Sequence, residues 1–254
     1  MSRSRLPIVA VALLLAIGIG GYVAYNQVLS GDSVAPLALA TPAPDPSQTS
    51  NPSDAVATAE TGASSEPAAG TDGDIAGTWS AAEGSQAGYR VREQLASLSA
   101  ESDAVGRTSD ITGSITVESD GTTTTLTEGT LTVDTTTIAS DEDRRDNRLR
   151  TEGLQTDSFP TATFTVTQPV EVPLAAMTGT ASDLTLVGDL TLHGVTQSVS
   201  IPAQAQLVDR TIQVQGSVSF PLADFDIVAP NVGGFIISIA DEGTLEFLVT
   251  FTKS

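Results

Sequence analysis

The amino-acid sequence predicts an all-β domain, folded as a closed antiparallel barrel of about eight strands. Two observations lead to this fold class. From Gly77 onward, apolar residues recur at alternate positions in one short segment after another, which is the pattern of half-buried strands. Gly, Asp and Pro separate these segments, as expected for turns in an antiparallel sheet. A sandwich of two packed sheets has a similar pattern and is the alternative architecture.

The clearest pair of strands flanks residues 187–196, with the sequence V-G-D-L-T-L-H-G-V-T. Before the turn, the residues that share one parity are Leu184, Leu186, Gly188, Leu190 and Leu192. After the turn, a second run of the same kind contains Val199, Ile201, Ala203, Ala205 and Leu207. We therefore expect two antiparallel strands joined at residues 193–196.

The other strands are expected at residues 89–95, 111–117, 126–133, 162–166, 212–220 and 245–251. An Asp-Gly dipeptide at 120–121 predicts a tight hairpin turn. A change of parity within the third of these strands predicts a bulge near residues 128–129. Two segments break the strand pattern. Residues 140–154 predict a short helix or an ordered loop that stops at Gly153, and residues 223–234 predict a loop.

The chain is expected to comprise a transmembrane anchor at residues 1–30, a linker at 31–74 and the barrel domain at 75–254. Residues 8–29 carry no charge and would span roughly 33 Å as a helix, against roughly 30 Å of hydrocarbon. Basic residues precede this segment, so the positive-inside rule places the domain outside the cytoplasm. A signal peptide cleaved before Thr41 is the alternative, with the same location for the domain.

The linker is rich in Pro, Ala, Ser and Thr and has no periodic apolar pattern. This composition predicts a disordered tether. A flexible coil of this length would reach roughly 35–40 Å from the membrane.

Composition excludes several functional classes. The net charge of −20 argues against a nucleic-acid partner, which would need a basic face. The chain has no cysteine and one histidine, His193, so a zinc site lacks ligands and histidine-dependent catalysis would rest on one residue. We expect neither an enzyme nor a cofactor or metal, and the sequence specifies no oligomeric state. A hydrolase built around His193 is a distant alternative.

The inward-facing positions of the predicted strands are aliphatic, with scattered Ala and Gly that would leave space inside the barrel. An apolar cavity of this kind suits a prenyl or acyl chain. The alternative is a barrel filled by Phe164, Phe220 and Phe247, with a structural or interaction role. The residues expected to line the tunnel are Ile115, Val117, Leu131, Val133, Phe164, Val166, Leu186, Gly188, Leu190, Ala203, Ala205, Val214, Val218 and Phe247.

The only basic cluster of the domain contains Arg144, Arg145, Arg148 and Arg150, among five acidic residues. One interpretation is local ion pairing along a helix. The other is that one or two of these arginines lie at a cavity mouth and bind an anionic or carbonyl head group.

Several motifs in order resemble the YceI-like family of extracytoplasmic lipid-binding proteins. The matching motifs are G-T-W-S with G-S-Q-A-G-Y-R-V at 77–91, R-D-N-R-L-R at 145–150, F-P-T-A-T-F at 159–164, G-D-L-T-L-H-G-V-T at 188–196 and A-D-F at 223–225. The resemblance implies an eight-stranded lipocalin-like barrel with a polyisoprenoid, such as an isoprenoid quinone or polyprenyl phosphate, in its tunnel. This chain departs from the family pattern at Arg148, Phe159 and Gln197, which are positions outside the apolar lining. Arg145, Arg148 and His193 are the residues expected to meet the head group.

The sequence therefore predicts a single-pass membrane protein whose barrel lies outside the cytoplasm and sequesters or carries a polyisoprenoid. Its expected partners are this lipid and, through the N-terminal helix, the membrane.

Overall fold

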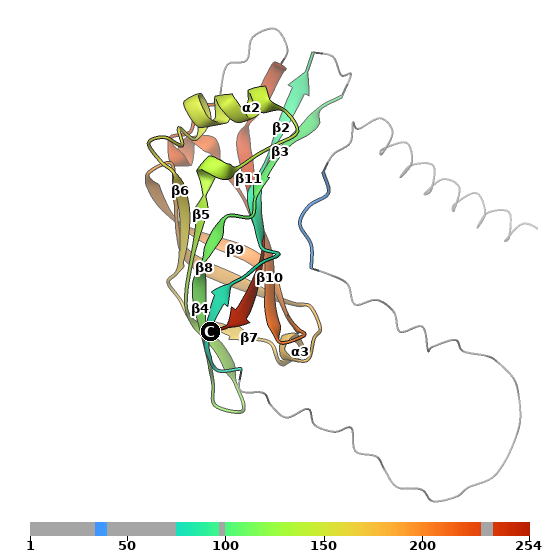
Figure 1. The fold of residues 1–254 in the computed structure, drawn as a ribbon, viewed down its shortest axis with the longest axis vertical. Coiled ribbons are helices and arrows are strands. Elements are labelled where there is room, and N and C mark those ends of the chain that lie inside the picture. Colours follow the sequence, from blue (N-terminus) through green and yellow to red (C-terminus); the bar gives the residue numbers. More distant parts are fainter. Residues whose placement is uncertain (1–33, 40–74, 97–99, 230–235) are drawn as a thin grey trace, which may run out of the picture.

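The computed structural model describes residues 34–39, 75–96, 100–229 and 236–254 (Figure 1). The strands are β1 (Gly77–Ala81), β2 (Gln86–Leu95), β3 (Ser102–Thr108), β4 (Ile111–Ser119), β5 (Thr124–Asp134), β6 (Thr161–Val166), β7 (Val170–Val172), β8 (Ser182–Leu192), β9 (Val195–Val208), β10 (Thr211–Pro221) and β11 (Ile236–Lys253). The helical segments are η1 (Thr135–Thr137), α2 (Asp143–Arg148), η2 (Leu149–Gly153), α3 (Leu174–Met177) and η3 (Leu222–Phe225).

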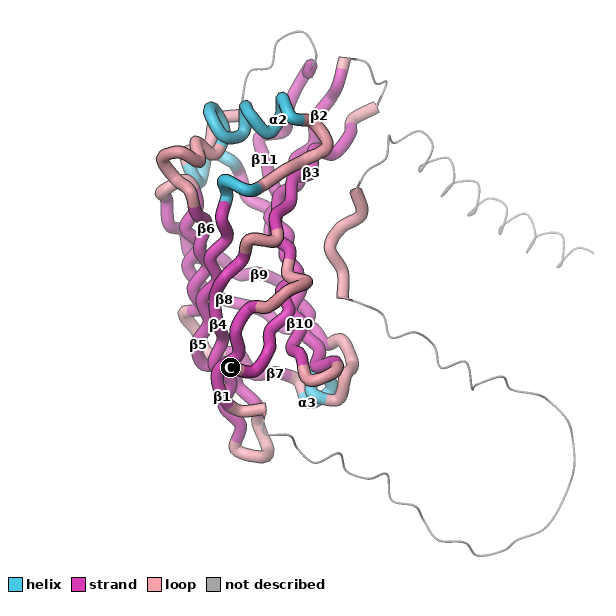
Figure 2. The backbone as a smooth tube through the Cα atoms, in the orientation of Figure 1, coloured by secondary structure: helices cyan, strands magenta, loops and turns pink. Residues whose placement is uncertain are grey.

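The strands close into an antiparallel barrel of eight positions, which confirms the predicted architecture (Figure 2). β1 and β2 follow one another along β11, because Trp79 pairs with Lys253 and Ala87 pairs with Phe247. β4 and β3 follow one another along β1 and β2 in the same way. β5, β6, β8, β9 and β10 complete the circuit back to β11.

The sequence prediction missed β1, β3 and the three-residue strand β7. Neither β1 nor β3 shows clean alternation. Trp79 is the one large apolar residue of β1, and its side chain is buried in the core. In β3, Ala104 and Val105 are neighbours with opposite parity, yet both are buried. Val105 faces outward, so part of the outer surface of the barrel is also covered.

Two-residue turns with left-handed backbone angles join neighbouring strands. His193 and Gly194 join β8 to β9 with φ angles of 51° and 77°, the left-handed pair of a type I′ hairpin. Asp209 and Arg210 join β9 to β10 in the same way, with φ angles of 48° and 65°. The predicted bulge is confirmed in β5, where the pairing with β4 skips residue 127.

The barrel is filled at one end and hollow at the other. The filled end, around β1, contains Trp79, Ile115, Val117, Leu126, Val170, Leu186, Ile201, Ala203, Ile212, Val249 and Phe251. A smaller cluster of Leu190, Leu192, Phe220 and Phe225 lies against η3. The predicted ordered segment at 140–154 is α2 followed by one π-helical turn, which ends at Gly153. α2 lies across the hollow end of the barrel, and α3 lies at the opposite end (Figure 2).

Residues 34–39, within the predicted linker, form an extended segment beside the barrel (Figure 1). Leu37 of this segment is 8% exposed. The predicted membrane anchor lies outside the described residues. Among the residues that the structure describes, no helix has the length and apolar character needed to span a bilayer.

Candidate lipid-binding site

A cavity of about 690 Å³ occupies the hollow end of the barrel. Its walls are mostly aliphatic and aromatic side chains from the inner faces of the strands, including Val91, Ala162, Leu190, Leu192, Phe220 and Leu245. Pockets of several hundred cubic ångströms with apolar walls are typical of sites for small organic ligands. The space that the sequence suggested is therefore present, but it is concentrated in one half of the barrel.

Phe164 and Phe247 form the floor of this cavity. Both rings also line a second cavity of about 60 Å³, which lies between them and the filled end. Each ring lies close to a glycine of the neighbouring strand. A Cβ atom on Gly188 would be 2.6 Å from Cζ of Phe164, and one on Gly216 would be 2.7 Å from Cζ of Phe247. The two glycines thus create the recesses that hold the rings against the wall.

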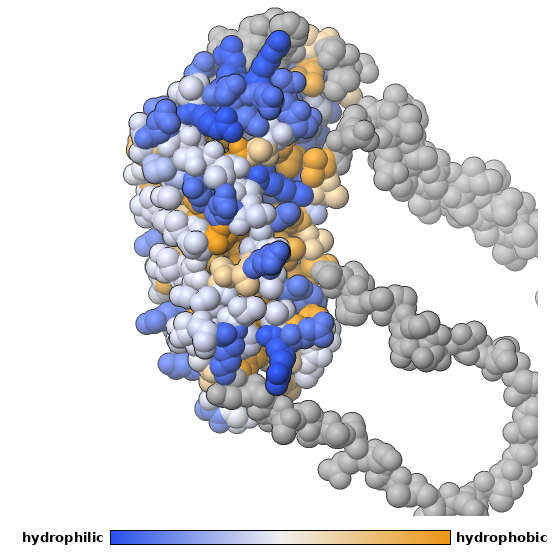
Figure 3. Space-filling model, viewed as in Figure 1, coloured by the Kyte–Doolittle hydropathy of each residue, from blue (hydrophilic) through white to orange (hydrophobic). Residues whose placement is uncertain are grey.

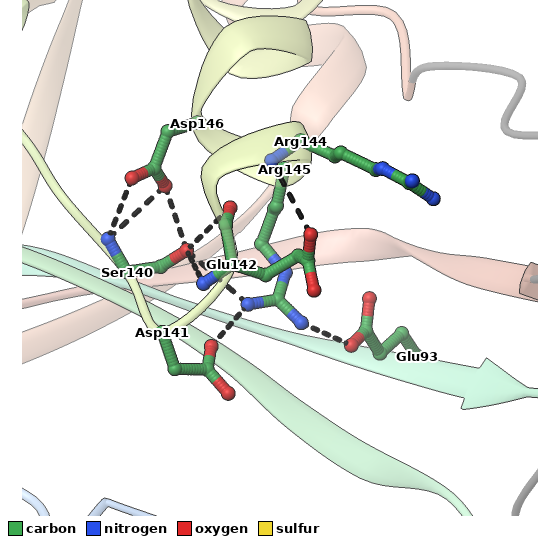
Figure 4. A network of polar contacts seen from close by, with 7 residues as sticks. All are labelled: Glu93, Ser140, Asp141, Glu142, Arg144, Arg145 and Asp146. Atoms are coloured by element: carbon green, nitrogen blue, oxygen red, sulfur yellow. Dashed lines mark hydrogen bonds and ion pairs between the residues drawn. The ribbon is translucent and has the colours of Figure 1, made fainter.

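The mouth of the cavity is polar and lies beneath α2. Figure 3 shows hydrophilic residues gathered over this end of the molecule. Arg145 reaches from α2 to Glu93 on β2, with 2.8 Å between Nη2 and Oε1, and Glu93 is 4% exposed. The other Nη atom of Arg145 donates to Asp141 and to the hydroxyl of Ser140. This network ties the helix to the barrel wall (Figure 4).

A buried carboxylate stabilises the loop that leads into α2. Asp146 accepts hydrogen bonds from the backbone N–H of Ser140, at 3.0 Å, and from its hydroxyl, at 2.6 Å. Burial of Arg145 disfavours its charge, but attraction to Glu93 and the hydrogen bonds to Asp141 outweigh this effect. The pKa of Arg145 therefore lies above its ordinary value, and the guanidinium stays charged at the mouth.

Tyr89 of β2 lines the cavity close to this network. Its ring lies over Gly106 of β3, where a Cβ atom would be 2.4 Å from Cε1 of the ring. The hydroxyl is buried and has no hydrogen-bond partner among the described residues, and the same holds for Nε of Arg145. Burial raises the pKa of Tyr89 to about 12, so the group is a neutral donor at physiological pH. Two donors without a partner among the described residues thus lie near the polar end of the cavity.

The structure distributes the residues predicted for the tunnel over three environments. The main cavity is lined by Leu131, Val133, Phe164, Leu190 and Phe247, together with Arg145 and Arg148 of the predicted head-group set. The smaller cavity is lined by Ile115, Val117, Val166, Leu186, Ala205 and Val214, and it shares Leu131, Phe164 and Phe247. Neither cavity is lined by Gly188, Ala203, Val218 or His193.

His193, predicted to meet the head group, lies instead in the β8–β9 turn. Its Nδ1 atom donates to the backbone carbonyl of Phe225 at 3.0 Å, and its ring meets Phe159 edge-on at 4.5 Å. The side chain is 8% exposed. These contacts connect the turn to η3 and to the segment before β6. Tyr89, a polar residue that does line the cavity, begins the strand expected at residues 89–95, so its position in that strand was the available signal.

Within the described part of the chain, no three His, Asp or Glu side chains are placed to hold a metal ion. Arg145 and Arg148 at the mouth are instead paired with nearby carboxylates.

A closed antiparallel barrel with a large, mainly apolar cavity and a polar mouth is the architecture of small-ligand-binding barrels. The amino-acid sequence also identifies the family. The model of the YceI-like domain matches residues 80–251, so the chain belongs to that family. No curated protein sequence matches the chain significantly.

Two solved structures share the fold. A polyisoprenoid-binding domain from Saccharophagus degradans, implicated in plant cell wall breakdown, aligns with a TM-score of 0.54 and 20% identity, over 70% of this chain and 99% of that one. BcnA of Burkholderia cenocepacia aligns with a TM-score of 0.50 and 14% identity, over 65% of this chain and 95% of that one.

Proposed function

We propose that this protein binds a polyisoprenoid lipid, with the tail in the 690 Å³ cavity and the head group at the mouth beneath α2. The observation that carries this proposal is the arrangement of polarity. The interior is apolar down to Phe164 and Phe247, and the unused donors of Tyr89 and Arg145 lie near the opposite end. An amphiphile with one polar end matches this distribution.

The head group is expected to present an oxygen acceptor. Tyr89 remains protonated far above neutral pH, so its hydroxyl can donate to a carbonyl or phosphoryl oxygen. Arg145 carries a fixed positive charge beside it, although Glu93 and Asp141 already neutralise much of that charge. The description of the Saccharophagus degradans structure as a polyisoprenoid-binding domain supports the ligand class.

The proposed location is the outer side of the cytoplasmic membrane, with residues 8–29 as a retained anchor. The uncharged length of this segment and the preceding Arg3 and Arg5 support the anchor and its orientation. In this setting the protein would sequester or carry a lipid that is almost insoluble in water.

Native mass spectrometry of the full chain, purified from membranes in mild detergent, tests the proposal. We expect a bound species whose mass, after extraction, belongs to a lipid built from isoprene units. Purified protein without any lipid, or with phospholipid alone, would contradict it and favour the filled-barrel module.

A further inference from the structure

The extended segment at residues 34–39, with the sequence V-A-P-L-A-L, is bound to the outer wall of the barrel. Two arginines hold its backbone. Arg90 of β2 donates to the carbonyl oxygen of Val34 at 2.8 Å, and Arg107 of β3 donates to that of Ala35. Leu37 is 8% exposed, although the residues on either side of it are exposed. The segment is therefore held by both polar and apolar contacts.

The wall beneath this segment is built around a buried carboxylate. Glu246 of β11 is 4% exposed although it faces outward, and it binds Arg107 at 2.6 Å and Arg90 at 3.5 Å. Arg107 reaches Glu246 by crossing Gly88, which lies between them in the sheet and lacks a side chain. A Cβ atom at Gly88 would be 2.9 Å from Cγ of Arg107. Glu246 thus fixes Arg107 in place, and Asp103 of β3, at 3.0 Å, fixes Arg90 together with Glu246, which leaves both arginines oriented toward the segment.

The direction of the segment follows from these contacts. β2 runs from Gln86 toward Glu93, which meets α2 through Arg145. Arg90 lies nearer to that end of β2 than Gly88, the residue that pairs with Arg107. Because Val34 binds Arg90 and Ala35 binds Arg107, Val34 is the end of the segment that lies nearer the α2 end of the barrel, where the cavity opens.

We propose that this docked segment holds the cavity mouth against the membrane surface. The inference rests on the proposed anchor at residues 8–29. Five residue steps separate Leu29 from Val34 and span at most about 18 Å. The barrel wall from Arg90 to Leu95 rises about 17 Å. A connection this short keeps the α2 end of the barrel close to the bilayer.

Two consequences follow from the docked geometry. A lipid leaving the bilayer enters the cavity directly, without crossing the roughly 35–40 Å that a free linker would allow. Cleavage before Thr41 would remove the docked segment from the domain, so the contacts of Val34, Ala35 and Leu37 favour a retained anchor.

Cysteine reactivity tests the docking itself, because the chain has no native cysteine. In the full chain reconstituted in nanodiscs, the thiol of Leu37→Cys should react with a water-soluble maleimide at least about tenfold more slowly than that of Ala38→Cys. Adding Arg107→Gln should abolish most of this protection. Equal rates at the two positions in the otherwise unchanged chain would overturn the docking.

Fluorescence quenching tests the orientation. A dye is attached to Asn147→Cys, on the exposed face of α2, or to Thr122→Cys, in the exposed β4–β5 turn at the far end. With quencher lipids in phosphatidylcholine vesicles, we expect strong quenching at 147 and little at 122. Leu37→Asp should remove this difference, whereas the adjacent exposed Ala38→Asp should preserve it.

Equal quenching at the two ends, a difference that survives Leu37→Asp, or a chain that fails to float with the vesicles would each overturn the orientation. Lipid occupancy, measured by native mass spectrometry on the same variants, reports on the proposed function separately. A chain that carries lipid but shows equal quenching refutes only the docked orientation.

Discussion

Ala162→Phe is the substitution that addresses the cavity most directly. Ala162 lies on β6, pairs with Val133 and faces the main cavity. A phenyl ring at this position takes up space comparable to one isoprene unit of the ligand. Expelling five carbons from the cavity costs about 4 kcal/mol, at about 0.8 kcal/mol per carbon. Affinity should therefore fall by about a thousandfold.

Retention of a radiolabelled isoprenoid quinone by the purified protein measures this effect. Thr161→Phe is the matched control, because Thr161 is the preceding residue on the same strand and its side chain is exposed. The control should bind within about twofold of the unchanged protein, since it leaves the cavity intact.

The thermal midpoint separates a blocked cavity from a damaged fold. If the cavity is open, the new ring enters free space and the midpoint of Ala162→Phe should change little. In a filled barrel, the same ring would overpack the core and cost about 1–3 kcal/mol. Unchanged retention in Ala162→Phe, or equal losses in both variants, would refute the assignment of the cavity as the binding site.

Three further predictions concern the wall, the mouth and the linker. Gly216→Ala should push the ring of Phe247 into the lumen and weaken quinone retention, and Phe247→Leu in the same chain should restore it. Limited proteolysis should cut within residues 40–74 and release an intact domain, whereas a first cut within residues 77–229 would contradict that boundary. In the released domain Tyr89 is the only tyrosine, and ultraviolet titration should find its pKa near 12. Tyr89 ionises near pH 10 in the unfolded state but only near pH 12 in the folded state. The free energy of unfolding should therefore fall by up to about 1.4 kcal/mol per pH unit between pH 10 and pH 12. Tyr89→Phe should remove this slope.

Local chemistry made most of the barrel predictable. The alternation around Leu186 and Leu190, and the turn at His193–Gly194, depend on neighbours in the sequence, so both were readable from it. β3 could not be predicted from its own residues, because Val105 is buried on the outer face of the barrel by residues from elsewhere in the chain. Gln206 shows the same limit: it faces outward by parity, yet it is 1% exposed and bonded to the side chain of Gln213.

The candidate site was predictable in kind but not in extent. Parity correctly indicated that Ala203 and Ala205 face inward, but it does not reveal which level of the barrel is filled. That depends on the rotamers of Phe164 and Phe247, which are set by glycines on neighbouring strands. The docking of residues 34–39 was equally hidden, because it depends on Arg90 and Arg107 being oriented by carboxylates on neighbouring strands, Asp103 and Glu246.

The floor of the cavity consists of two side chains, and this has a consequence for divergence among barrels of this kind. Phe164 and Phe247 divide the lumen while the strands that carry them continue past it. A smaller residue at either position would join the 60 Å³ space to the 690 Å³ space without altering any strand register. The depth of the cavity can thus change during evolution while the barrel itself stays the same. Single codon changes at these two positions can therefore produce carriers that accept lipid tails of different lengths.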